Sequence, residues 1–174
     1  MSHTGMQPGA AILPRIPDES VCSTLLAQIP LQVAAHSRAV QRLALEMCDA
    51  LAAHGVWLNR ALLSAAALLH DICRTEPNHA FVGAQKLRDL GYPEIADIVA
   101  AHHDWSDGPF DESALLYLAD KYMQGDQRVT LEERFERSRA KCHTEQALCA
   151  HDRRYRLALE AQQQYDLLIG EKQP

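Results

Sequence analysis

The chain has 174 residues, of which 47% are hydrophobic and 23% are charged, and its formal net charge at pH 7 is −6. This length predicts one domain with a sizeable core, and the composition is typical of a globular protein in aqueous solution. The negative charge argues against bulk nucleic acid as a partner, because a phosphate backbone needs a basic surface. No apolar run reaches the roughly 20 residues that cross a bilayer, so no membrane partner is expected.

The beginning of the chain, residues 1–17, contains three prolines and two glycines, and we expect a flexible arm there, ahead of a helical domain over residues 18–174. This stretch has neither the cationic start nor the apolar core of a signal peptide. The chain has five cysteines, an odd number, and they show no CxxC spacing. Reduced thiols in a cytoplasmic protein fit this pattern best.

Two helices are predicted over residues 18–29 and 31–54. Asp18 suits the N-cap of the first helix, and Pro30 suits the first turn of the second. In the second helix, apolar side chains recur at helical spacing, and His36 falls within their stripe.

The most apolar helix is predicted over residues 61–72, with Asn59 as its N-cap, because alanine and leucine dominate it. A helix that is apolar on all sides belongs in the middle of a bundle. This one nevertheless ends in His70 and Asp71. Burying these two groups costs several kcal/mol unless a partner, such as a divalent metal, satisfies them. The alternative is that His70 ends the helix and Asp71 turns towards solvent.

The rest of the chain is also helical in pattern. Further helices are predicted over residues 79–90, 94–103, 112–124 and, in the C-terminal part, within 130–169. Thr130 and Glu133 have the spacing of a capping box. No segment shows the alternation that is typical of a strand. The sequence therefore predicts an all-α fold, a compact single-domain bundle of about seven helices.

Polar residues interrupt several of these apolar helices. They are His36, the pair His70-Asp71, the pair His102-His103 and Asp120. One buried histidine is usually a hydrogen-bonded core residue, but four such cases in one small domain favour a common site. Imidazole and carboxylate groups together suit Zn, Mn, Fe, Co or Ni rather than Ca.

The order of these residues resembles the HD superfamily of metal-dependent phosphohydrolases. His36 precedes Ser-Arg-Ala-Val, His70-Asp71 lies in the context LLHDI, and Asp120 lies in the context LADK. The resemblance covers roughly residues 31–125. It implies an HD-type helical domain in which His36, His70, Asp71 and Asp120 hold a divalent metal ion (Mn, Fe, Co, Ni, Zn or Mg).

Many members of this superfamily hold two metals, and His79, His102 and His103 match the additional histidines. Adjacent residues on a helix point about 100° apart, so at most one residue of the pair His102-His103 should face a given metal unless the helix end unwinds. The alternative is that these three histidines contact substrate phosphate beside a single metal.

The sequence departs from the superfamily pattern in two places. Arg74 stands where a lysine is common, and its guanidinium can hold a phosphate in a forked geometry or act only as a favourable cation at a helix end. The loop after His103 resembles that of the HD-GYP cyclic-dinucleotide diesterases. Pro109-Phe110-Asp111 replaces the Gly-Tyr-Pro of those enzymes, which argues against a cyclic-dinucleotide substrate. The segment after Asp120 is similar to that of small bacterial HD proteins and, more distantly, to the symmetrical diadenosine-tetraphosphate hydrolases.

The resemblance implies a phosphohydrolase of the phosphomonoesterase, nucleotidase or phosphodiesterase type, in which a metal-activated water attacks a nucleotide or another small phosphate ester. Asp71 would orient the water, and Arg74 and Lys121 would hold the phosphate oxygens. The expected partner is this small phosphorylated substrate, and homodimer formation is left open. The alternative is a non-catalytic HD sensor or partner domain that binds a metal or a nucleotide, and a purely structural bundle is the third reading.

Overall fold

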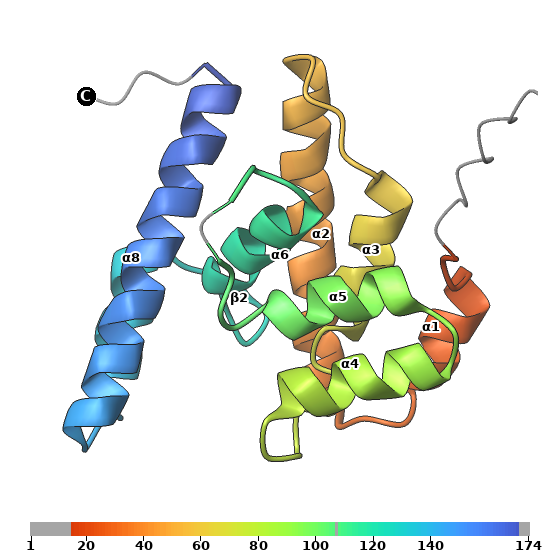
Figure 1. Ribbon diagram of the computed structural model, residues 1–174, viewed down its shortest axis with the longest axis horizontal. Helices are drawn as coiled ribbons and strands as arrows, with labels where there is room; N and C mark the ends of the chain where they lie inside the picture. Colours follow the sequence, from red (N-terminus) through yellow and green to blue (C-terminus); the bar gives the residue numbers. More distant parts are fainter. Residues whose placement is uncertain (1–14, 107, 171–174) are drawn as a thin grey trace, which may run out of the picture.

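The computed structural model describes residues 15–106 and 108–170, and within them it contains eight α-helices and two short β-strands (Figure 1). In chain order these are α1 (Glu19–Leu26), α2 (Leu31–Ala53), α3 (Arg60–Leu69), α4 (His79–Asp89), α5 (Pro93–Ala101), α6 (Glu112–Lys121), β1 (Met123–Gln124), β2 (Gln127–Arg128), α7 (Leu131–Arg139) and α8 (Glu145–Leu168). The predicted all-α class is confirmed, and the predicted number of about seven helices is close to the eight in the described residues. Most of the predicted arm, up to residue 14, lies outside the described residues.

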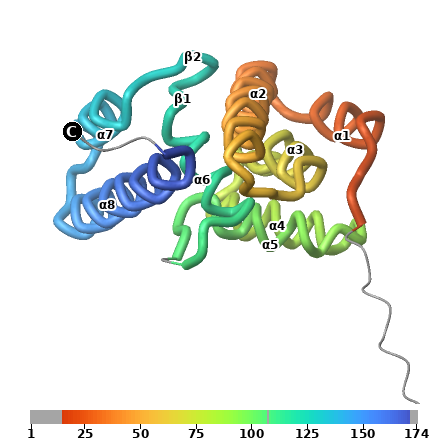
Figure 2. The backbone as a smooth tube through the Cα atoms, turned by 90° about the horizontal axis from the view of Figure 1, so that it is seen from above, coloured from red at the N-terminus to blue at the C-terminus, as the bar shows by residue number. Residues whose placement is uncertain are grey.

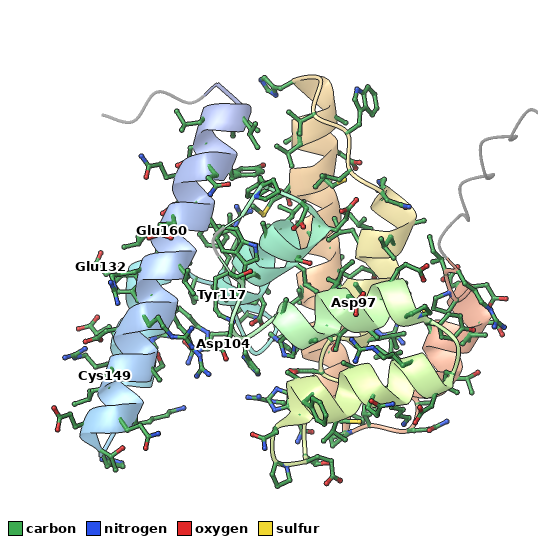
Figure 3. All side chains as sticks on the ribbon, in the orientation of Figure 1. Asp97, Asp104, Tyr117, Glu132, Cys149 and Glu160 are labelled. Atoms are coloured by element: carbon green, nitrogen blue, oxygen red, sulfur yellow. The ribbon has the colours of Figure 1, made fainter. Side chains whose placement is uncertain are left out.

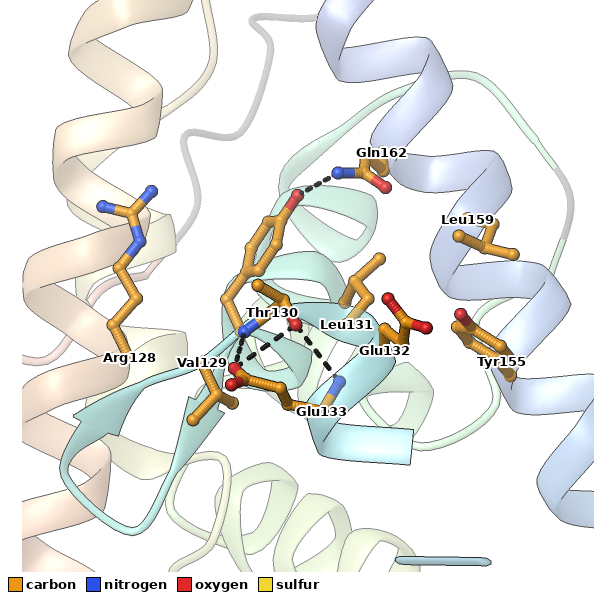
Figure 4. Close-up of a pocket in the computed structure, with 10 residues that line it drawn as sticks. Arg128, Val129, Thr130, Leu131, Glu132, Glu133, Tyr155, Leu159 and Gln162 are labelled. Carbon is orange, nitrogen blue, oxygen red and sulfur yellow. Dashed lines mark hydrogen bonds between the residues drawn. The ribbon is translucent and has the colours of Figure 1, made fainter. Parts of the chain in front are cut away.

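Side-chain caps begin most of the helices at the places that the sequence indicates. Asp18 accepts a hydrogen bond from the backbone of Val21, and Asn59 accepts one from Leu62. Thr130 and Glu133 form the predicted capping box at the start of α7, as the dashed lines in Figure 4 show. Such caps satisfy backbone N–H groups that have no partner within the helix.

Helix α3 is the centre of the core, as its apolar sequence predicts. It packs against α1, α2, α5 and α6. Residues 65–69 of α3 are all buried, and the small alanine side chains among them let neighbouring helices approach closely. The C-terminal end of α3 therefore lies deep in the molecule, where its polar residues need partners.

The pair α4 and α5 packs side by side across the end of α3 (Figure 1). Gly83 of α4 lies against Ile72 in the turn after α3. A Cβ atom at position 83 would come within 3.3 Å of Ile72 Cγ2 and 3.7 Å of Val99 Cγ1. The glycine thus allows α4 to approach the turn that carries Asp71.

Helices α7 and α8 lie on the opposite side of α2 from α1 (Figure 2). The antiparallel hairpin of β1 and β2 connects α6 to α7, with Gly125 at φ 60° in its turn. Tyr117 of α6 donates a hydrogen bond to the backbone carbonyl of Arg154 in α8, and Asp104 pairs with Arg153 and Arg154. Tyr117 and Asp104 are labelled in Figure 3 between α8 and α5.

Four predicted helix ends differ from the structure by two residues or more. The helices predicted to end at residues 29, 72, 103 and 124 end instead at Leu26, Leu69, Ala101 and Lys121. The chain leaves α6 to form the hairpin, whose strands of two residues are too short to give an alternating pattern. No helix in the described part of the chain combines the length and the apolarity that crossing a membrane requires.

Candidate metal centre

Each predicted metal-binding residue lies at or near a helix end that faces one common site. His36 comes from α2, and His70 and Asp71 follow α3. The remaining residues are His79 at the start of α4, His102 and His103 after α5, and Asp120 in the last turn of α6. The structure thus brings together side chains that are up to 84 positions apart in the sequence.

The two carboxylate oxygens of Asp71 face different pairs of histidines. Oδ2 lies 3.6 Å from Nε2 of His70 and 3.9 Å from Nε2 of His36. Oδ1 lies 3.2 Å from Nε2 of His79 and 3.5 Å from Nε2 of His102. Asp71 therefore stands between two sets of imidazole nitrogens and belongs to both.

Asp120 completes the first of these sets. Its Oδ1 lies 3.1 Å from Nε2 of His36 and 3.8 Å from Nε2 of His70. Its Oδ2 accepts a hydrogen bond of 2.7 Å from the ammonium of Lys121, which also donates to the backbone carbonyl of His102 at 3.2 Å. The buried Lys121 thus connects the carboxylate of α6 to the turn after α5.

Backbone carbonyls orient three of the imidazole rings. Nδ1–H of His36 donates to Gly125 at 2.7 Å, that of His70 to Ala67 at 2.8 Å, and that of His102 to Val99 at 2.6 Å. A carbonyl oxygen only accepts, so each of these rings carries a proton on Nδ1. In the neutral rings of His70 and His102 the lone pair of Nε2 then points into the site, whereas Nε2 of His36 lies 3.1 Å from Oδ1 of Asp120, which is also an acceptor. Metal-binding histidines are typically held in this way.

Several atoms in the centre are buried and have no hydrogen-bond partner among the described residues. They are Nε2 of His70, Nε2 of His102 and Oδ1 of Asp71. An unsatisfied buried polar group costs about 1–3 kcal/mol. Bound divalent cations would satisfy these lone pairs, and the mixed nitrogen and oxygen donors suit a transition metal. The residues present therefore fit the metal centre that the sequence predicts.

Two overlapping groups of side chains can each hold an ion. His36, His70 and Asp71 form one group, with ligand atoms within 4.8 Å of one another. The other group shares Asp71 and adds three histidines: His79, His102 and His103. Their assignment as ligands of one metal or of two stays a prediction.

The protonation states of the centre also suit a metal. Burial lowers the pKa of His70 to about 4, and burial together with the charges of His102 and Lys121 lowers the pKa of His103 to about 2. Burial opposes the ionisation of Asp120, but the charge of Lys121 and the hydrogen bond with His36 outweigh it and hold its pKa well below the usual range. The neutral imidazoles of His70 and His103 and the ionised carboxylate of Asp120 are the forms that bind metal. Burial alone would lower the pKa of His36, but the hydrogen bond with Asp120 and its charge outweigh burial and raise that pKa, so a bound metal would displace a proton there.

Both histidines of the pair after α5 reach the centre because the helix ends before them. His102 is the C-cap of α5, and its ring takes the carbonyl of Val99 as a partner. His103 lies beyond the helix, and its Nε2 is 2.6 Å from Nε2 of His79. The centroids of the two imidazole rings are 4.1 Å apart, so both rings lie at the same site.

Arg74 lies at the exposed edge of the same site. Its Nη1 donates to Nε2 of His79 at 3.0 Å, and its Nε lies 3.7 Å from Oδ2 of Asp71. A cleft of about 310 Å³ leads to this site and is lined by Arg74 and by the buried Asp71 and Asp120. Arg134 and Lys141 also line this cleft, and neither is among the predicted site residues.

These features define a class: a helical protein with a buried histidine and aspartate centre that opens into a cleft. The HD domain family model matches residues 33–153, which is more than half of the chain. The chain therefore belongs to the HD domain family, as its motifs predict. The match extends beyond the predicted motif range of 31–125 and includes α7. No curated protein and no solved structure matched the chain in the corresponding searches.

Proposed function

We propose that this protein is a metal-dependent phosphohydrolase that acts on a nucleotide or another small phosphate ester. The observation that carries the proposal is the position of Asp71, whose two carboxylate oxygens face two separate pairs of imidazole nitrogens. Two metal ions that share one carboxylate are a common arrangement in enzymes that cleave phosphate esters.

The first ion would be held by His36, His70, Asp71 and Asp120. The second would be held by Asp71 together with the histidines that face its other oxygen: His79, His102 and His103. Metal ions bound there would lower the pKa of water and stabilise negative charge on phosphoryl oxygens. Mn, Fe, Co, Ni and Zn all accept this ligand chemistry, and the number of imidazoles makes Mg less suitable.

The other polar residues would bind and orient the reactants. Asp71 is buried, and the imidazoles of His102 and His79 outweigh that burial and hold its pKa below the usual range, so it is ionised at neutral pH and can orient an attacking water. Arg74 at the edge of the cleft can hold two phosphate oxygens in a forked geometry. Lys121 would balance the charge of Asp120 and hold it in position, and its predicted contact with phosphate stays a prediction.

The proposal is tested with purified protein in two linked measurements. Elemental analysis gives the bound metal, and a phosphate-release screen covers nucleotides and phosphomonoesters. Metal-dependent turnover that is lost in Asp71→Ala supports a phosphohydrolase. Bound metal without turnover on any compound of the screen contradicts it and favours the non-catalytic sensor domain.

A further inference from the structure

The cleft beside the candidate metal centre is lined by cationic side chains that neither bind metal nor belong to the HD motif. Arg134 of α7 and Lys141, in the turn after α7, line it together with Arg74. Among the described residues, the carboxylates that line this cleft are Asp71 and Asp120, and both face the histidines. This local charge contrasts with the net charge of −6 for the whole chain.

Arg134 has no carboxylate partner among the described residues. Its Nε donates to the backbone carbonyl of Met123 at 3.1 Å, which fixes the half-buried side chain beside the hairpin. Several other arginines of the chain do form ion pairs, such as Arg60 with Asp49 and Arg154 with Asp104. A half-buried guanidinium without a counter-ion, at the opening of a metal centre, is suited to an anionic ligand.

Arg134 also lines a second cavity, of about 290 Å³, which lies between α7, α8 and the metal centre. His103 and Lys121 line that cavity as well, whereas its apolar side includes Phe135. Arg134 and His103 line both the cleft and this second cavity, so the cleft and the cavity lie next to each other. A ligand with one phosphate at Asp71 would therefore have room for a second group beside Arg134.

We propose that Arg134, with Lys141, binds a second phosphate of the substrate that does not react. This inference rests on the proposed function and narrows the substrate to compounds with at least two phosphate groups, such as a nucleoside diphosphate or triphosphate. The single phosphate of a monoester would already be balanced by the metal centre and Arg74. Two further cations in the same cleft then need a further anionic group.

The test is calorimetric binding to the full, metal-loaded chain at a constant concentration of free metal. The probes are methylenediphosphonate, which resembles a diphosphate but is not hydrolysed, and orthophosphate. We expect Arg134→Gln to weaken diphosphonate binding at least about 10-fold, because a charge-assisted hydrogen bond is lost, while orthophosphate binding is unchanged. Arg156→Gln is the matched control, since Arg156 is exposed on α8 and lines neither space.

Arg134→Lys guards against an effect on folding, because it keeps the charge and loses only the forked geometry. We expect intermediate diphosphonate binding for this variant, with a circular dichroism spectrum like that of the wild type. Equal binding of diphosphonate by the wild type and by both Arg134 variants would overturn the proposal. An equal loss for both probes would also overturn it, because Arg134 would then act on the first phosphate.

The outcome is separable from that of the proposed function. If the wild type hydrolyses phosphate esters but Arg134→Gln binds diphosphonate normally, the phosphohydrolase stands and the second phosphate site is wrong. If no ester is hydrolysed but diphosphonate binding depends on Arg134, the second phosphate site stands and the phosphohydrolase is wrong.

Discussion

The ammonium of Lys121 lies 2.7 Å from Oδ2 of Asp120, and both side chains are buried. The two residues are adjacent in the last turn of α6, so one helix supplies both a carboxylate of the candidate metal centre and its counter-ion. Removing one partner of a buried pair leaves an uncompensated charge. The pair therefore sets both the stability of α6 and the position of Asp120.

The first prediction concerns this pair. Lys121→Met should lower the free energy of unfolding of the metal-free protein by about 3 kcal/mol, because the Asp120 carboxylate stays buried without its cation. Urea denaturation in the presence of a chelator measures this change. Arg156→Met, at an exposed position, should stay within about 0.5 kcal/mol of the wild type. Equal urea midpoints for Lys121→Met and Arg156→Met would show that Lys121 does not stabilise the fold.

The second prediction concerns Asp71. Asp71→Ala should reduce kcat by several orders of magnitude on the true substrate, because the variant loses the group that faces both sets of histidines. The fold should be retained, since α3 itself is packed through buried leucine and alanine side chains that the variant leaves unchanged. Phosphate release and circular dichroism measure the two effects.

Asp97→Ala provides the control for that variant. Asp97 lies on the exposed surface of α5, where Figure 3 labels it. It forms an ion pair with Arg88 of α4, and exposed pairs of this kind contribute little to stability. We expect its kcat to be unchanged. If the Asp71→Ala variant had a kcat close to that of Asp97→Ala, the assignment of the active site to Asp71 would be wrong.

The main residues of the metal centre are predictable from sequence because each interrupts an apolar helix. A buried histidine or aspartate in such a helix needs a polar partner. His36, His70 and Asp120 can be partners of one another only if their helices bring them to one site. The precise helix ends are less predictable. Helix α5 ends at Ala101, and the ring of His102 then bonds to the carbonyl of Val99. A helix that continued through His103 would have the same sequence pattern.

Arg134 and Lys141 illustrate what sequence reasoning misses. The capping box at Thr130 predicts where α7 begins, but the face that α7 turns towards the centre depends on the preceding hairpin. The strands of that hairpin have only two residues each, which is too short for an alternation of apolar and polar side chains to indicate a strand. The residues of the candidate metal centre are therefore easier to predict than the residues of the cleft around it.

The third prediction follows from this dependence of the cleft on α7. Thr130→Ala should lower the free energy of unfolding by about 1 kcal/mol, because the backbone N–H of Glu133 loses its acceptor. It should also weaken diphosphonate binding, since α7 presents Arg134. Thr24→Ala is a suitable control, because the hydroxyl of Thr24 bonds only within the exposed surface of α1. Chemical denaturation and calorimetry distinguish the two effects.

The last prediction concerns the number of metals. His79 faces Oδ1 of Asp71, whereas His36 and His70 face Oδ2, so the loss of His79 should affect only one of the two ligand groups. Activity should rise with up to two equivalents of metal per chain in the wild type, and with one equivalent in His79→Ala. His54→Ala, in which an exposed histidine at the end of α2 is lost, should titrate like the wild type. Saturation of the wild type at one equivalent would exclude a required second metal, and His79, His102 and His103 would then be ligands of the substrate phosphate beside a single ion.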